Sequence, residues 1–370
     1  MANFFRKTIK RIIVITNVMV VILFLLACLS SELTPAKFWW VGFAGLLVPY
    51  LIVLLCFSIL FWLIVKPALA LISIITLVTG WHQIDVIFAT HLRSEFVTEK
   101  EPNSIRIVDW NVESFNGLSK NKETKKHTRE DVAASIFQLQ PDIVCLQEFN
   151  TSSLQGLQSD NLLLFTKIYP YHYFSKDYSR ANGLYQSGCI IFSKYKIVDS
   201  GRIKYRVAES LIYADMVKNN DTFRIYTTHL QSFKFKKEDY DGIEKIAEQD
   251  EEGLAASKNV YLKMRVAFKR RGLQAKIVRE ALDKCTLPSI ICGDFNDVPN
   301  SYTYFHIKGA RQDVFLDKGL GIGRSFLALA PTLRIDYILP DQNFSIKQFD
   351  MVDEGLSDHI MLVSDLALKK

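Results

Sequence analysis

The amino-acid sequence predicts an α/β protein with mixed β-sheets, preceded by three apolar membrane-spanning helices. Residues 12–88 contain long runs that are almost free of charge, whereas residues 100–370 have the composition of an ordinary soluble domain. Short β-branched runs alternate with turns and a few helical patterns in this second part. Polar residues stand where several of these runs begin or end, as expected at the rim of a sandwich that mixes parallel and antiparallel strands.

Three apolar runs make up the N-terminal part, and each is long enough for a membrane-spanning helix. About 20 apolar residues cross a bilayer core of roughly 30 Å. A signal peptide explains one such run, but three in succession, with no small-residue cleavage site after the first, favour a membrane anchor over residues 1–90. The lipid bilayer is therefore an expected partner. The three predicted spans cover residues 12–29, 41–65 and 68–88.

Basic residues flanking these runs predict their orientation. Four of them, Arg6, Lys7, Lys10 and Arg11, precede the first run, and Lys66 separates the second from the third. Positively charged residues stay on the cytoplasmic side of a membrane. Three crossings then place the rest of the chain outside the cytoplasm, which in a Gram-negative cell is the periplasm. We expect a multi-pass integral membrane protein with an extracytoplasmic soluble domain.

The charge of the soluble part argues against a dedicated binder of long duplex nucleic acid. Residues 1–100 contain eight of the 45 Lys and Arg residues and four of the 39 Asp and Glu residues. The remaining 37 basic and 35 acidic residues leave a net charge of only +2, whereas duplex binders are usually more basic. The six cysteines show no zinc-ligand spacing. We therefore expect each cysteine to be a small, buried apolar residue.

A linker over residues 91–104 leads into a domain over residues 105–370. Helical spacing predicts one helix from Thr128 to a stop at Pro141, and another over Ser257–Leu282, with Gly272 as a potential break. The charged stretch between Lys234 and Glu252 predicts a solvated insertion or helix pair. Eight strands are predicted at Ile105–Trp110, Ile143–Gln147, Cys189–Phe192, Leu211–Val217, Phe223–Thr228, Ser289–Cys292, Ile335–Leu339 and Ile360–Asp365.

Eight polar residues at the ends or beginnings of these strands are the candidates for chemistry. Each alone is weak evidence, because a strand-terminal Asp or Asn is more often a turn former or a helix cap, and a lone His is usually a hydrogen-bonded structural residue. The ordered set as a whole is informative. It consists of Asn111, Glu148, His229, Asp294, Asn296, Asp336, Asp358 and His359.

This ordered set resembles the endonuclease/exonuclease/phosphatase family, whose fold is shared by pancreatic-type deoxyribonucleases, abasic-site endonucleases, inositol polyphosphate 5-phosphatases and neutral sphingomyelinases. The resemblance covers about residues 104–368 and rests on the strings DWNV, PDIVCLQEF, THLQS, ICGDFNDVP, RIDYIL and LSDHIML. It implies a four-layer α/β/β/α sandwich of two mixed sheets. It also implies hydrolysis of a phosphate ester by direct attack of water on phosphorus, with no covalent enzyme intermediate.

The residue types fit that chemistry, which requires neutralised phosphoryl oxygens and an activated water. Glu148 offers a hard oxygen ligand for Mg²⁺, with Mn²⁺ as the alternative ion. Asn111 serves as a neutral ligand to the metal or phosphate, and Asp358 as a further carboxylate. The expected metal set is therefore Asn111, Glu148 and Asp358.

The remaining residues take catalytic roles. Asp294 orients or deprotonates the attacking water, and Asn296 steadies Asp294 or the phosphate. Asp336 pairs with His359, raises its pKa from roughly 6.5 and favours the charged donor. A protonated His359 then stabilises the transition-state charge. His229 is a second donor at the phosphate or the leaving group.

One feature departs from the family pattern. Some nucleases of the family have an acidic partner for the first His in the segment before the third strand, but here that segment, SRANGLYQSGCIIF, has no acid. The partner of His229 is therefore not predicted, and Tyr185 is an alternative phosphate contact.

The substrate is open between two classes. One is a phospholipid headgroup or another surface phosphodiester within reach of the anchor, and the other is nucleic acid cleaved by an extracytoplasmic nuclease. A catalytically inactive binding or scaffold protein is a third hypothesis, disfavoured because every expected position holds a competent residue. No protein partner is predicted.

Overall fold

The computed structural model describes residues 2–91, 96–116, 122–154, 159–235, 238–239 and 251–369. The chain forms two compact units. The first comprises Met1–Phe88, Phe233–Leu273 and Val298–His306, and the second comprises Ala89–Ser232, Gln274–Asp297 and Ile307–Lys370. The domain boundaries expected from the sequence remain a prediction. Most of the charged insertion lies outside the described residues.

Two helices of the first unit, α1 (Ala2–Cys28) and α2 (Trp40–Val65), are long and apolar enough to cross a membrane. Most of their apolar surface is not covered by protein, since only 17% of the most apolar window of α1 and 28% of that of α2 are buried. The short turn η1 (Leu29–Ser31) follows α1. These two helices correspond to the first two predicted spans.

The third predicted span, residues 68–88, is wrong as a single membrane-crossing helix. The chain there forms α3 (Pro67–Thr79), of 13 residues, and the single turn α4 (Trp81–Ile84). Gly80 is the C-terminal cap of α3 and separates the two helices. It also lies against α1, where a Cβ would be 2.2 Å from the ring of Phe24. Glycine is common at the end of a helix, so α3 ends although the apolar run continues.

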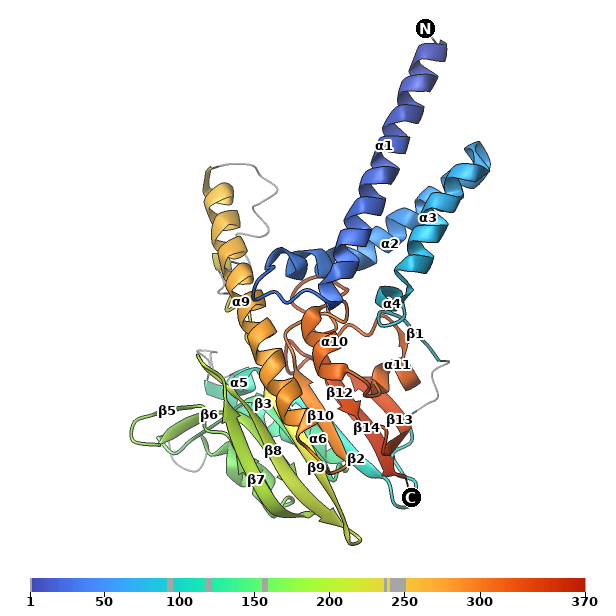
Figure 1. The fold of residues 1–370 in the computed structure, drawn as a ribbon. Helices are drawn as coiled ribbons and strands as arrows, with labels where there is room; N and C mark the ends of the chain where they lie inside the picture. Colours follow the sequence, from blue (N-terminus) through green and yellow to red (C-terminus); the bar gives the residue numbers. More distant parts are fainter. Residues whose placement is uncertain are drawn as a thin grey trace. The chain divides into compact units, whose positions relative to one another are not determined.

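A seven-stranded sheet in the second unit combines the strands of residues 105–193 with the last two strands of the chain (Figure 1). Its order is β13–β14–β2–β3–β6–β4, with β5 also paired to β6. The central strands β2 (Ile105–Asn111) and β3 (Ile143–Ser152) are parallel and joined by α6 (Lys122–Gln138), as a parallel crossover requires. The other strands are β4 (Tyr171–Phe174), β5 (Tyr178–Arg180), β6 (Tyr185–Ser193), β13 (Phe344–Val352) and β14 (Met361–Leu368).

A five-stranded sheet is formed by strands between residues 196 and 340, in the order β12–β10–β9–β8–β7. Strands β9 and β10 are parallel, and the other pairs are antiparallel. Both sheets are therefore mixed, as predicted. The strands are β7 (Lys196–Lys204), β8 (Ser210–Lys218), β9 (Asp221–His229), β10 (Ser289–Asp294) and β12 (Asp336–Pro340). A separate two-stranded sheet pairs β1 (Ala89–Thr90) with β11 (Leu320–Gly321).

Apolar side chains from the two sheets pack together in one buried cluster. Ile107 and Cys145 from the first sheet meet Ile225 and Ile290 from the second. A second cluster joins the seven-stranded sheet to helix α6, whose Val132 and Ile136 are fully buried. The predicted apolar periodicity of this helix therefore marks the face that covers the sheet. The order of all four predicted layers remains a prediction.

The remaining helices of the described chain are short, apart from α9. These are α5 (Glu113–Asn116), α7 (Asn161–Thr166), α10 (Tyr302–Lys308) and α11 (Val314–Lys318). Helix α9 (Glu251–Asp283) runs 33 residues and continues through Gly272, where a break was considered. All eight predicted strands are found, at β2, β3, β6, β8, β9, β10, β12 and β14.

Candidate active site

Strand register brings three of the candidate residues into one row of the five-stranded sheet. Parallel pairing sets Asp294, the last residue of β10, opposite His229, the last residue of β9. Antiparallel pairing sets Asp294 opposite Asp336, the first residue of β12. The mixed sheet thus places two strand ends and one strand beginning at the same edge.

Gly293 allows this row to form. It has φ +137°, and a Cβ there would lie 2.1 Å from the carbonyl oxygen of Thr228 on the neighbouring strand. Only glycine fits so close to another backbone in this conformation. The glycine in the string GDFND is therefore required by the close packing of β10 against β9, and this packing positions the backbone of Asp294.

The seven-stranded sheet contributes Asn111 and Glu148. Asn111 ends β2 and is paired with Gln147 in β3. The pairing of β3 with β6 shifts register between Leu146 and Phe149, and Glu148 in this bulge has φ +53°. Bulges of this kind redirect a side chain beside a site, and Glu148 is aimed away from the regular alternation of β3.

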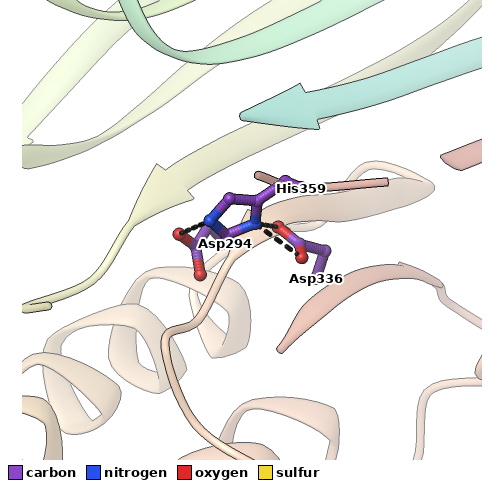
Figure 2. A group of neighbouring side chains, drawn as sticks. All are labelled: Asp294, Asp336 and His359. Carbon is purple, nitrogen blue, oxygen red and sulfur yellow. Dashed lines mark hydrogen bonds and ion pairs between the residues drawn. The ribbon is translucent and has the colours of Figure 1, made fainter. Parts of the chain in front are cut away.

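His359 and Asp336 form a hydrogen-bonded pair (Figure 2). The Nδ1 atom of His359 lies 2.9 Å and 3.1 Å from the two carboxylate oxygens of Asp336. Burial alone lowers the pKa of His359, but the nearby Asp336 and Asp294 outweigh it and raise this pKa to about 10. The imidazole is therefore a positively charged donor at neutral pH.

Asp294 is the centre of the site. Its carboxylate accepts hydrogen bonds from the side-chain amide of Asn111 at 3.1 Å and from the backbone and side-chain N–H groups of Asn296 at 2.7 and 3.0 Å. Its Oδ2 lies 3.5 Å from Nε2 of His229 and 3.8 Å from Nε2 of His359. Burial and the neighbouring Asp336 raise the pKa of Asp294 to about 6, close to the value that suits a general base.

A second group of carboxylates lies beside this centre. Glu113 has its pKa raised to about 7 by burial and then by the charges of Asp358 and Glu148. Burial also raises the pKa of Asp358, with Glu148 adding to the effect. Together with Glu148, Glu113 and Asp358 form a set of hard oxygen donors whose negative charge a divalent cation would neutralise.

Glu209 is the acidic neighbour of His229 that could not be named from the sequence. Its Oε1 lies 3.7 Å from Nδ1 of His229. Burial lowers the pKa of His229, but Glu209, Asp294 and Glu148 together raise it above the usual value. Glu209 comes from the end of the β7–β8 connection. Tyr185, the alternative considered for phosphate contact, instead lies under Arg180, whose guanidinium is 4.4 Å from the ring centre.

All eight predicted residues belong to one network of described contacts. Glu148 joins it through Nε2 of His229 at 3.9 Å, and Asp358 through Nε2 of His359 at 4.0 Å. Asp294, Asp336 and His359 also lie close enough to hold a metal ion, with one ligand atom of each within 4.8 Å of the others. Nδ1 of His359 already bonds to Asp336, and a protonated imidazole is not a metal ligand, so the charge state of His359 disfavours a metal ion at this group.

Sequence comparison finds two family matches. The model of the "Endonuclease/Exonuclease/phosphatase family" matches residues 110–359. A "Domain of unknown function (DUF8431)" matches residues 10–87. The first match spans the whole candidate site. No curated protein matches the chain in sequence.

Solved structures are similar to this chain, and the first of them, with a TM-score above 0.5, supports the same fold. The human Nocturnin catalytic domain with bound sulfate anion is 19% identical, with a TM-score of 0.51 over 72% of this chain and 94% of that one. Zebrafish (D. rerio) TDP2 in complex with a single-strand DNA product is 16% identical, with a TM-score of 0.48 over 71% and 98% of the two chains. Sphingomyelinase C from Streptomyces griseocarneus is 17% identical, with a TM-score of 0.45 over 71% and 99%.

Proposed function

Because the chain belongs to the endonuclease/exonuclease/phosphatase family, and so is a metal-dependent hydrolase of phosphoric esters, we propose that it is a membrane-anchored, Mg²⁺-dependent phosphodiesterase or phosphatase. The observation that carries this proposal is the environment of Asp294. A buried carboxylate with a pKa of about 6 receives hydrogen bonds from Asn111 and Asn296 and faces two histidines.

The donors beside Asp294 fit a hard divalent cation. Glu148, Asp358 and Asn111 are the residues that would hold Mg²⁺, and Glu113, whose backbone N–H donates to Oδ1 of Asn111 at 3.1 Å, is a further candidate. Mg²⁺ prefers one or two carboxylates and keeps several waters. When bound, the ion would neutralise charge on the phosphoryl oxygens.

The protein side chains supply the proton transfers. Asp294 accepts a proton from the attacking water. The water oxygen forms a bond to phosphorus as the ester P–O bond breaks. His359, held charged by Asp336, donates a hydrogen bond to a phosphoryl oxygen on which charge develops. His229, oriented by Glu209, is placed to protonate the departing oxygen. Asn296 holds Asp294 in position, with its amide also bonded to the carbonyl oxygen of Leu230 at 3.0 Å.

Membrane anchoring is supported by surface chemistry and by packing. Large apolar side chains on α1 and α2, such as Ile12 at 58% and Leu54 at 50% exposure, need an apolar surrounding. A cleaved signal peptide would not pack stably with the helices after it, whereas here Ser73 of α3 donates to the Asn17 side chain of α1 at 3.0 Å. Such buried polar pairs join helices within membranes.

The register of α3 against α1 supports an extracytoplasmic catalytic domain. Ser73 bonds to Asn17, and Gln83 donates to the carbonyl oxygen of Cys28 at 3.1 Å. The stretch from Ser73 in α3 to Gln83 in α4 therefore runs parallel to α1 at a nearly constant offset, which sets Lys66 level with the basic residues that precede the first span. Residues 67–84 then cross the same depth as 18 residues of α1, about 27 Å at 1.5 Å per residue. Both basic ends lie on one side, which the positive-inside rule makes cytoplasmic.

We propose a phospholipid headgroup or another surface phosphodiester as the substrate, because the anchor keeps the active site near the bilayer. The test is a panel with Mg²⁺ and the full chain: bis-p-nitrophenyl phosphate, phospholipid vesicles and plasmid DNA. Hydrolysis of vesicle lipid that is lost in Asp294→Ala and His359→Ala supports the proposal. Hydrolysis of plasmid DNA alone would make the enzyme an extracytoplasmic nuclease, and no hydrolysis and no Mg²⁺ binding would make it a scaffold.

A further inference from the structure

The first half of helix α9 carries a basic segment that the catalytic machinery does not use. Residues Ser257–Leu273 contain six Lys or Arg residues and no Asp or Glu. Lys263 is paired with Asp239, and the guanidinium of Arg265 lies 5.0 Å from the ring centre of Trp39. The segment keeps a clear positive charge after these contacts are counted.

One face of this segment packs against the N-terminal end of α2. Phe268 is fully buried, and its ring lies 5.0 Å from that of Phe43. Gly42 allows the approach, since a Cβ there would be 2.4 Å from the Phe268 ring. Tyr261 meets Trp39, the residue just before α2, at 5.5 Å. Tryptophans at the end of a membrane span mark the headgroup level, so this packing holds the segment at that level.

The opposite face is exposed and combines apolar with basic side chains. Leu262, Val266 and Leu273 are 44%, 45% and 46% exposed, and at 100° per residue they fall on the same side as Lys258 and Lys269. Single exposed apolar residues are ordinary. Three on one face of one helix, interleaved with lysines and free of acids, are the pattern of a helix that lies in a membrane interface.

We propose that this exposed face of residues 257–273 binds the headgroups of anionic phospholipids, with Leu262, Val266 and Leu273 entering the headgroup boundary. An anionic bilayer matches both the charge and the apolar side chains. A nucleic acid backbone would match the charge alone, so the lipid surface is favoured. The inference rests on the proposed membrane anchoring but requires no hydrolysis.

The test measures how fast a water-soluble maleimide labels Leu262→Cys in the full chain held in lipid nanodiscs. The partly exposed cysteines Cys28, Cys56 and Cys285 are changed to Ser, and the three buried ones remain. Labelling should be slower in discs that contain phosphatidylglycerol than in phosphatidylcholine discs. Val207→Cys, 60% exposed in the other compact unit, serves as the reference and should label equally in both.

Charge reversal tests whether slow labelling of Leu262→Cys is caused by binding to anionic lipid. Each basic residue near an anionic surface strengthens lipid binding about fivefold. Lys258→Glu combined with Lys269→Glu should therefore weaken binding of this face to anionic lipid by about 25-fold and restore fast labelling. Lys196→Glu with Lys204→Glu, on exposed positions of β7, should leave the protection intact.

Three results would overturn the inference. Equal labelling of Leu262→Cys in both discs means that the face does not bind anionic lipid. Protection by an added oligonucleotide in phosphatidylcholine discs, without protection by phosphatidylglycerol, makes it a nucleic-acid surface. Failure of the full chain to enter nanodiscs removes the anchoring on which it rests. Loss of phosphodiesterase activity with protection retained would instead contradict only the proposed function.

Discussion

The protonation state of His359 depends on the carboxylates around it. Burial lowers its pKa, and Asp336 and Asp294 reverse that effect and raise the pKa to about 10. The charged imidazolium is the form proposed to act, so activity should be present below this pKa and lost as pH rises through it. Asp336 makes the closest contact and provides the means to test the assignment.

Replacing Asp336 with Asn should move the alkaline limb of activity to lower pH. The amide removes the charge that stabilises the imidazolium, so the pKa of His359 falls toward its ordinary value. The measurement is kcat/KM for bis-p-nitrophenyl phosphate as a function of pH. Asp317→Asn, at a side chain 45% exposed, should leave the profile in place. An unmoved alkaline limb in Asp336→Asn would remove His359 as the charged donor.

Glu209→Gln should lower kcat about tenfold, a part of the 10²–10⁴-fold that a positioned acid contributes. The change removes a charge that raises the pKa of His229 and helps to orient its ring, while substrate contacts are retained. We therefore expect KM to change little and the pKa of His229 to fall, so that the limb of the pH profile of kcat that depends on protonated His229 moves to lower pH. Glu354→Gln, at an exposed position, is the control. Wild-type kcat in Glu209→Gln would show that Glu209 has no positioning role.

The site residues differ in how far the sequence predicts them. Strand-end position and order identify eight residues that the structure brings into one network of contacts. Glu209 was missed, although the hairpin pairing of Lys218 with Asp221 places residue 210 opposite His229 by counting back from the turn. Glu113 could not be found in this way, because it depends on a left-handed turn of the chain after β2, with φ +44°.

At the scale of single elements, the strand that ends in Asp294 is the most constrained. Gly293→Ala should destabilise the protein by about 3 kcal/mol, since the new Cβ meets the Thr228 carbonyl oxygen in a conformation unfavourable to alanine. Displacement of Asp294 should also lower kcat, even at a temperature where the variant remains folded. The measurements are chemical unfolding and kcat at a temperature where both proteins are folded.

Gly355→Ala is the matched control for that change. Gly355 also has positive φ, +64°, but nothing lies within 4 Å of a Cβ built there. Gly355→Ala should lower the free energy of unfolding only by the cost of placing alanine in a left-handed conformation, about 1 kcal/mol. Equal destabilisation by the two substitutions would mean that contact with the neighbouring strand does not matter at Gly293.

Elements were predictable where they are buried on both faces. Strands β2 and β3 appear in the sequence as short runs rich in β-branched residues, and the covering face of α6 appears as helical spacing. Strand β7 was missed because its residues are mostly exposed or half-buried at a sheet edge, so no periodic apolar signal exists. The end of α3 at Gly80 was missed because the apolar run continues past it, although glycine is a local signal for the end of a helix.

At the scale of the whole molecule, the two sequence regions match two different families and differ in charge and apolar content. The register of α3 against α1 leads to a prediction about sidedness. A reporter enzyme that is active only outside the cytoplasm should be active when fused after Lys37 or Phe96 and inactive after Lys66. Activity after Lys66, or its absence after Phe96, would contradict the proposed three-crossing topology.

The most direct test of the central claim is the rate of bis-p-nitrophenyl phosphate hydrolysis by the full chain as Mg²⁺ is titrated. The wild type should depend on Mg²⁺ and lose activity with a chelator. Asp294→Asn should be slower by about 10³-fold at every Mg²⁺ concentration, whereas Glu148→Gln should require more Mg²⁺ for the same rate. Hydrolysis that survives both the chelator and Asp294→Asn would contradict the account.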